Sequence, residues 1–114
     1  MTLRFVEGKS SKKDAVKYWH IYEGTNRAGY VYVSKSKDEL IGEHLSINIF
    51  INKNWQRKGI GTIAYIEVPK LVAAKKLYAH MAISNAGSFR AALKAGYKEI
   101  ISEDFKQRVM VWKK

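Results

Sequence analysis

The strongest constraint on the fold is a change in hydrophobic spacing that occurs between residues 51 and 61. In the segment 45–51 every second residue is apolar, and these four side chains share one face, as in a half-buried β-strand. From Gly61 to about Lys76 the apolar residues instead approximate helical spacing, and Pro69 is expected to kink or shorten that helix. The sequence therefore predicts a buried strand that leads through a short polar loop into a helix.

Further strands are predicted on both sides of this unit. Alternation before it marks strands at 3–5, 16–22 and 30–33, with a turn at 23–27. After it come a strand at 77–83, a helix at 89–94, and strands at 97–101 and 105–112. We expect one domain, 1–114, with an α+β fold of the α/β three-layer type. Its central mixed, mostly antiparallel sheet would have about six to seven strands, accompanied by two main helices.

The composition excludes several classes of protein. There is no cysteine, which excludes a disulfide framework and a thiolate zinc site, and we predict no metal centre. No apolar stretch approaches the roughly 20 residues needed to cross a bilayer. The first ten residues carry charges and no apolar run of signal-peptide length. We therefore expect a cytoplasmic protein that does not enter membranes.

The net charge of +11 creates a positive field that attracts polyanions. A nucleic acid, an acidic protein and a phosphate-rich cofactor are all compatible with it. Because the basic residues are spread along the whole chain, a solvated basic surface accounts for the charge equally well. Tyr18, Trp19 and Tyr32 could stack on nucleic-acid bases, although aromatic residues at alternate strand positions more often belong to a core. Charge alone does not decide the function.

The loop between the strand and the helix has the properties of an anion site. The first N–H groups of a helix have no internal partner, and the helix dipole adds partial positive charge. Gly59 and Gly61 lack the Cβ atoms that would keep a pyrophosphate away from these groups, while Arg57 and Lys58 add full charges. The spacing fits neither a P-loop nor a dinucleotide-binding fingerprint. A phosphate-bearing ligand is predicted here.

Two segments resemble, in order, the signatures of the GNAT superfamily of N-acetyltransferases. Residues 56–61, Gln-Arg-Lys-Gly-Ile-Gly, match the Q/R-x-x-G-x-G/A motif of that family. Residues 85–97 look like its second signature, N-x-x-S/A ending in G-F/Y, and a strand of suitable length separates the two. The resemblance covers the chain from about residue 45 to its end, whereas the first forty residues match only as strands.

The resemblance implies an enzyme that transfers an acetyl group from acetyl-CoA to an amine. The strand backbone at 49–51 would pair with the pantetheine arm where two strands splay apart, and residues 57–62 would hold the pyrophosphate. Such a chain aligns amine and thioester, and a backbone N–H stabilises the oxyanion. The implied cofactor-binding residues are Ile49, Phe50, Ile51, Gln56, Arg57, Lys58, Gly59, Ile60, Gly61, Thr62, Asn85 and Ser88.

The catalytic base departs from the family pattern. Many relatives place a glutamate where this chain has Leu45 or His80, and a tyrosine acid where it has Ala92. His80 and Glu43 are the remaining candidates for the base, since imidazole titrates near neutrality and Glu43 shares a strand face with Leu45. A lone strand histidine is more often structural, and a carboxylate there can simply be solvated.

Other polar side chains close to this segment leave the acid unassigned. His44 is expected to point away from the face of Leu45 if the strand is regular. The candidates for the acid are Tyr78, Ser84 and Tyr97, of which Tyr97 fits a core position better.

The N-terminal region also departs from the family. Relatives carry one or two helices between their first two strands as part of the acceptor pocket, and residues 8–14 are too few to form them. The acceptor site would then be open or completed by a second copy in a homodimer. Its positive surroundings favour a macromolecular amine, such as a protein lysine or N-terminus or an aminoacyl group on RNA. The alternative is a catalytically degenerate GNAT-like basic module that binds nucleic acid or an acidic protein.

Overall fold

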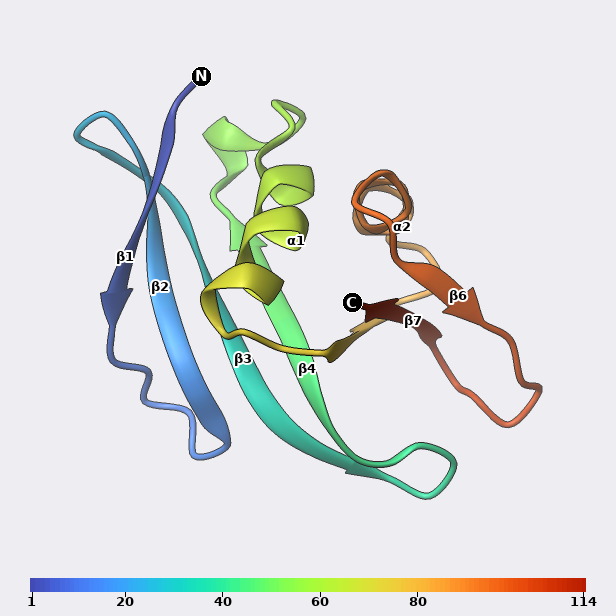
Figure 1. Ribbon diagram of the computed structural model, residues 1–114. Coiled ribbons are helices and arrows are strands. Elements are labelled where there is room, and N and C mark those ends of the chain that lie inside the picture. Colours follow the sequence, from blue (N-terminus) through green and yellow to red (C-terminus); the bar gives the residue numbers. More distant parts are fainter.

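A computed structural model describes residues 1–114 and shows one seven-stranded sheet with the strand order β1-β2-β3-β4-β5-β7-β6 (Figure 1). Neighbouring strands are antiparallel except β4 and β5, which are parallel. The predicted α+β class, with a mixed sheet and two main helices, is confirmed. The elements are β1 (Leu3–Gly8), β2 (Ala15–Glu23), β3 (Asn26–Asp38), β4 (Gly42–Ile51), η1 (Lys53–Trp55), α1 (Ile60–Leu71), β5 (Lys76–Met81), α2 (Ala86–Lys94), β6 (Lys98–Ile100) and β7 (Arg108–Lys113).

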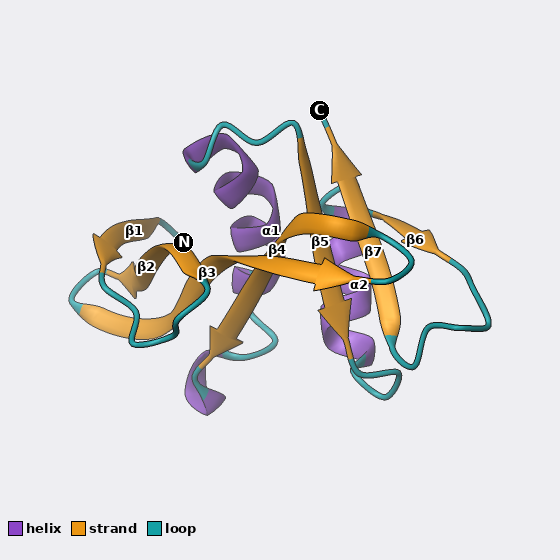
Figure 2. Cartoon of the chain, turned by 90° about the horizontal axis from the view of Figure 1, so that it is seen from below, coloured by secondary structure: helices purple, strands orange, loops and turns teal.

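Both helices pack on one face of the sheet, and one continuous core joins them to it. In Figure 2, β4 lies between the group β1–β3 and the group that contains β5, β6 and β7. The expected third layer is absent, because the connection 9–14 between β1 and β2 forms no helix. The opposite face of the sheet therefore carries no helix. The longer helix, α1, has 12 residues, and neither helix is long and apolar enough to cross a membrane.

The element boundaries differ from the predictions for local reasons. β3 extends to Asp38 because it pairs with β4 along its whole second half. α1 ends at Leu71 rather than near residue 76, since Ala73 has a left-handed backbone with φ of 50°. α2 begins at Ala86 rather than at 89, because the Asn85 side chain accepts a hydrogen bond from the N–H of Ser88 at 3.1 Å.

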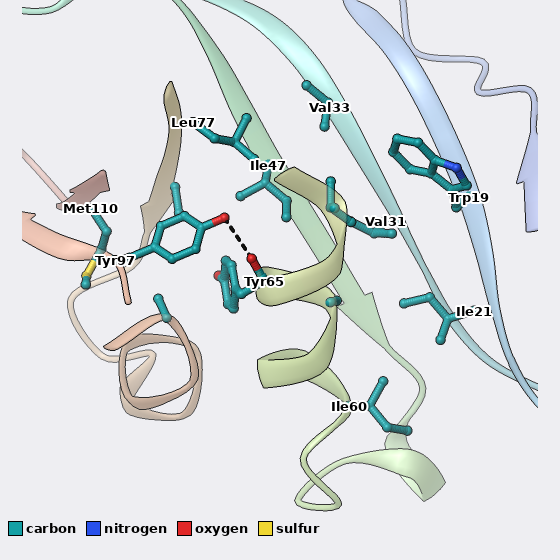
Figure 3. Packing of buried hydrophobic residues seen from close by; sticks show 14 of the residues in the cluster. Trp19, Ile21, Val31, Val33, Ile47, Ile60, Tyr65, Leu77, Tyr97 and Met110 are labelled. Carbon is teal, nitrogen blue, oxygen red and sulfur yellow. Dashed lines mark hydrogen bonds between the residues drawn. The ribbon is translucent and has the colours of Figure 1, made fainter. Parts of the chain in front are cut away.

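Pro69 lies in the last turn of α1, where its missing N–H leaves the Tyr65 carbonyl without a helical donor. The hydroxyl of Tyr97 donates to that carbonyl at 3.2 Å (Figure 3). Tyr97 is only 2% exposed, and burial raises the pKa of its phenol well above the ordinary value, so the hydroxyl keeps its proton. A tertiary contact thus supplies the hydrogen bond that the proline removes from the helix.

Replacing Tyr97 by phenylalanine should lower the free energy of unfolding by about 1–3 kcal/mol, because the buried Tyr65 carbonyl loses its donor. The second change Pro69→Ala should recover part of this loss, since it restores a helical N–H. Denaturant unfolding of wild type, both single variants and the double variant measures the coupling. If Tyr97→Phe lowers the free energy of unfolding equally with proline and with alanine at position 69, the hydroxyl of Tyr97 does not compensate for the proline.

Candidate active site

The parallel strands β4 and β5 separate after one pair of residues. Ser46 and Tyr78 are the only partners between them, whereas β4 pairs with β3 over its full length. Beyond Ser46, β4 has no strand partner on the β5 side. The predicted splay of these two strands is confirmed, and it leaves β4 backbone groups available to a ligand.

A cleft of about 640 Å³ opens at the separated end of β4. This volume lies in the range of roughly 300–1,000 Å³ that is typical of small-molecule sites. The last residues of β4, the glycine-containing loop, the start of α1 and one side of α2 form its walls. Its lining contains no aspartate or glutamate but three basic residues, Arg57, Arg90 and Lys94. The cleft is therefore suited to a ligand that carries several negative charges.

The N-terminus of α1 opens into this cleft without a side-chain cap. Its N-cap residue is Gly59, with φ of 83°, and its first turn contains no acidic residue. The free N–H groups and the positive end of the helix dipole therefore remain available to an anion. Arg57 also has a left-handed backbone, with φ of 63°. Such a conformation costs a non-glycine residue about 1–3 kcal/mol, and strained backbone of this kind occurs often at ligand sites.

Among the predicted cofactor-binding residues, Lys58 alone does not line the cleft; its side chain is exposed beside it. Two of the others also make internal hydrogen bonds. Gln56 Nε2 donates to the carbonyl of Ile51 at 3.0 Å, and Asn85 caps α2. The predicted residues that line the cleft are Ile49, Phe50, Ile51, Gln56, Arg57, Gly59, Ile60, Gly61, Thr62, Asn85 and Ser88.

Six lining residues were not predicted from the sequence. Arg90 and Lys94 stand four positions apart on α2, a spacing that places both on one side of a helix and could have identified them. Tyr65 reaches the cleft from α1, and burial raises the pKa of its phenol. No local pattern marks the other four, which are Trp55, Tyr65, Gly87 and Ala91.

Two histidines meet on the face of the sheet that carries no helix. The Nε2 atoms of His44 and His80 lie 2.9 Å apart. His44 also packs edge-on against Tyr78, with ring centroids 4.8 Å apart. Leu45 packs against the core on the other face, as predicted, so His44 does point away from it. The sequence did not show that His80 shares the face of His44.

The hydrogen bonds of this pair define where a proton can bind. His44 Nδ1 lies 2.8 Å from the carbonyl of Gly42, which only accepts, so this nitrogen carries hydrogen. In the neutral pair, His44 Nε2 then accepts from His80 Nε2–H. The free lone pair of His80 is consequently on Nδ1.

Burial lowers the pKa of His80, the neighbouring His44 lowers it further, and Asp38 acts weakly in the opposite direction. Because the ordinary value is 6.5, His80 is neutral at pH 7 and able to accept a proton. No group of three or more histidine and acidic side chains forms a metal-binding cluster.

The other candidates for acid and base lie in different surroundings. Glu43 is exposed at the start of β4 and takes part in no ion pair. Ser84 is exposed in the connection between β5 and α2, and Tyr97 is in the core. Tyr78 is the candidate acid that contacts the histidine pair. The hydroxyl of Ser46, where β4 and β5 part, is buried and has no hydrogen-bond partner, which is rare for a buried polar group.

No family model and no curated protein matches the sequence. Solved structures of acetyltransferases share its fold. A Bacillus subtilis acetyltransferase in complex with CoA matches with a TM-score of 0.73 and 14% identity, over 99% of both chains. The aminoglycoside acetyltransferase AAC(6')-Ib in complex with coenzyme A gives a TM-score of 0.72 and 19% identity, over 90% of this chain and 68% of its own.

An acetyltransferase of the GNAT family from Streptococcus pneumoniae also matches, with a TM-score of 0.65 and 16% identity, over 91% of this chain and 70% of its own. At identities this low the likeness establishes the fold. The chain has the fold of GNAT acetyltransferases, which agrees with the two sequence signatures.

Proposed function

We propose that the protein is an acetyl-CoA-dependent N-acetyltransferase that transfers an acetyl group to an amine. The observation that carries the proposal is the cleft itself, which joins an uncapped helix N-terminus to the unpaired end of β4 and has only basic charged residues in its lining. Acetyl-CoA combines a pyrophosphate with an amide-containing arm. The first needs N–H donors and positive charge, and the second needs free strand backbone.

Each wall of the cleft suits one part of this co-substrate. The N–H groups of the segment 57–62 would hold the pyrophosphate, and the backbone of 49–51 would pair with the pantetheine arm. Arg90 and Lys94 on α2 supply further positive charge along the same cleft. α1 and α2 meet at Gly61, where an added Cβ would lie at an ordinary contact distance of 3.7 Å from the Cβ of Ala91, so these two walls of the cleft are close together.

In the proposed reaction, His80 is the general base. The amine nitrogen bonds to the acetyl carbon, the bond from that carbon to sulfur breaks to release CoA as a thiolate, and the amine proton passes to Nδ1 of His80. The Nε2–H of His80 remains bonded to His44, which keeps the ring oriented and disperses the new charge. Because both histidines are on the helix-free face, the acceptor amine would approach from that face.

The acceptor we propose is an amine on a macromolecule. No helix closes over the helix-free face, and the connection 9–14 leaves it open. An open, positively charged face can accommodate a large acidic acceptor, whereas it does not enclose a small one. A cytoplasmic setting, where acetyl-CoA is available, is part of the same proposal.

Release of free CoA thiol, followed with protein, peptide, aminoacyl-RNA and aminoglycoside acceptors, tests this function. We expect turnover with a macromolecular amine, and mass spectrometry should find one added acetyl group. Turnover only with aminoglycosides would support acetyl transfer but contradict the macromolecular acceptor. Binding of acetyl-CoA without turnover of any acceptor would favour the degenerate basic module instead.

A further inference from the structure

The helix-free face of β2, β3 and β4 carries a continuous group of aromatic rings. Tyr30 is stacked with Tyr18 at 5.5 Å between ring centroids and with Phe50 at 5.3 Å, and it lies 6.4 Å from Tyr32 in a nearly parallel orientation. None of these four rings belongs to a buried hydrophobic cluster. We call this group, Tyr18, Tyr30, Tyr32 and Phe50, the aromatic platform. Trp19, the neighbour of Tyr18, is instead in the core.

An arginine is fixed over the platform without a compensating carboxylate. Arg27 donates to the hydroxyl of Tyr18 at 2.9 Å and to Nδ1 of His20 at 3.0 Å, and its guanidinium lies 5.5 Å from the ring centroid of Tyr30. No acidic side chain forms an ion pair with it. Its positive charge is therefore held at a defined position beside aromatic rings and is free to attract an anion.

A second, smaller pocket borders the platform. Its volume is about 170 Å³, so it admits a single chemical group rather than a whole cofactor. The connection between β1 and β2 forms one wall with two lysines and two serines, and the platform forms the other with three tyrosines. No acidic residue lines it. The lining consists of Lys9, Ser10, Ser11, Lys12, Tyr18, Tyr30 and Tyr32.

The platform also reaches the acetyl-CoA cleft. Phe50, which stacks on Tyr30, is one of the residues that line that cleft and is 51% exposed. A ligand that extends from the small pocket across Tyr30 would therefore arrive at the cleft. The surface offers partly exposed aromatic rings, a fixed guanidinium and a lysine-lined pocket along one path.

We propose that the helix-free face binds single-stranded nucleic acid. Unpaired bases stack on exposed aromatic rings and guanidinium planes, and their phosphates require uncompensated cations close to those rings. The platform with Arg27 meets the first requirement, and the pocket with Lys9 and Lys12 meets the second. The site goes beyond acetyl transfer, since it needs neither the cleft nor the histidine pair. If both sites operate, the bound strand lies beside the cleft.

Fluorescence anisotropy with labelled single-stranded RNA and DNA of about 12 nucleotides tests this site, since aromatic platforms of this kind engage roughly 4–16 nucleotides. The whole protein should bind these strands more tightly than a duplex of equal length, and more tightly at low salt. Tyr32→Ser and Tyr18→Ser should each weaken binding by about tenfold, the size expected when a stacking ring is removed.

Two substitutions at the far end of the sheet serve as matched controls. Ile101→Ser removes a hydrophobic side chain that is 87% exposed, and Lys98→Gln removes an exposed positive charge from β6. Neither should change the affinity by more than about twofold, whereas Arg27→Gln should reduce it clearly. Thermal unfolding confirms that each variant folds.

Several results would overturn the proposal. Absence of oligonucleotide binding would overturn it even if acetyl-CoA still binds. An equal loss of oligonucleotide affinity in the tyrosine variants and in the control variants would also overturn it, since diffuse charge would then explain the binding. Equal affinity for duplex and single strands would exclude base stacking. Sedimentation that shows a dimer disrupted by Tyr32→Ser, with no oligonucleotide bound, would assign the face to a second copy of the chain.

Discussion

Acetyl-CoA binding should weaken by about a hundredfold or more in the variant Gly61→Glu. Gly61 lies in the first turn of α1 and lines the cleft, so a carboxylate there would stand close to the proposed pyrophosphate position. Two like charges about 4 Å apart repel by about 4 kcal/mol at the effective dielectric constant near a protein surface. The carboxylate would also compete for the free N–H groups of the helix. Calorimetric titration with acetyl-CoA measures the change.

Two further substitutions at the same position separate charge from volume. An added Cβ at Gly61 would meet Ala91 at an ordinary van der Waals distance of 3.7 Å, so Gly61→Ala should fold and retain most of its affinity. Gly61→Gln has nearly the volume of the glutamate without its charge. An equal loss for glutamine and glutamate would show that bulk rather than charge closes the site, and the electrostatic explanation would then fail.

The turnover number should fall by a factor of about 10²–10⁴ in His80→Gln, the usual contribution of a general base. The Michaelis constant for acetyl-CoA should change little, because His80 does not line the cleft. Steady-state kinetics with a turned-over amine acceptor provides the test. Glu43→Gln is the matched control, since Glu43 is the other candidate base and is exposed. A large loss in this control with little loss in His80→Gln would transfer the role to Glu43.

The dependence of the rate on pH follows from the same residue. His80 acts as base only when neutral, and burial together with His44 lowers its pKa from the ordinary 6.5. The value of kcat/KM should therefore stay high as the pH decreases to 6.5 and fall only at lower pH, as the pH passes through the lowered pKa. His44→Gln removes one cause of the lowered pKa, so the decrease of kcat/KM on the acidic side should occur at higher pH. If this decrease occurs at the same pH as in the wild type, His44 does not influence the pKa of the base.

Local patterns were sufficient to predict the strands and the position of the loop between β4 and α1. Leu45–Ile51 alternates because one side of β4 faces the core, and the glycines of the loop are needed where the backbone must approach a ligand or adopt positive φ. Eleven of the residues named from the sequence line the cleft, whereas six of its lining residues were not named. The ends of the helices were less predictable, since they depend on Asn85 as a cap and on the left-handed backbone of Ala73.

The remaining features depend on contacts between distant segments. Predicting the histidine pair would require the register between β4 and β5. That register is defined by the single pair Ser46 and Tyr78, and no local sequence pattern indicates it. In the same way, the tolerance of Pro69 in α1 is explained by the hydroxyl of Tyr97, a residue that follows α2 in the chain and donates to the Tyr65 carbonyl. The missing third layer could be inferred from the short connection 9–14. The aromatic platform on that open face depends on the register of β2, β3 and β4, which brings its four rings together.

The absence of helices on one face links the two proposed sites. The proposed acetyl-CoA cleft is built on the helix-covered side, from α1, α2 and the end of β4, whereas the histidine pair and the aromatic platform are on the open side. A large acceptor could therefore bind across the open face while its amine reaches the splay between β4 and β5. Acetyl transfer and strand binding can be tested separately, because each has its own substitutions.

The most direct test of the proposed cleft is an NMR titration of the isotope-labelled protein with acetyl-CoA, followed through backbone amide signals. We predict that the largest shifts occur at residues 57–62, at 49–51 and in the first turn of α2, with smaller changes at His80. The amides around Tyr18 and Tyr32 should move little. Absence of shifts at saturating acetyl-CoA, or shifts centred on the aromatic platform instead of the glycine loop, would contradict the central claim.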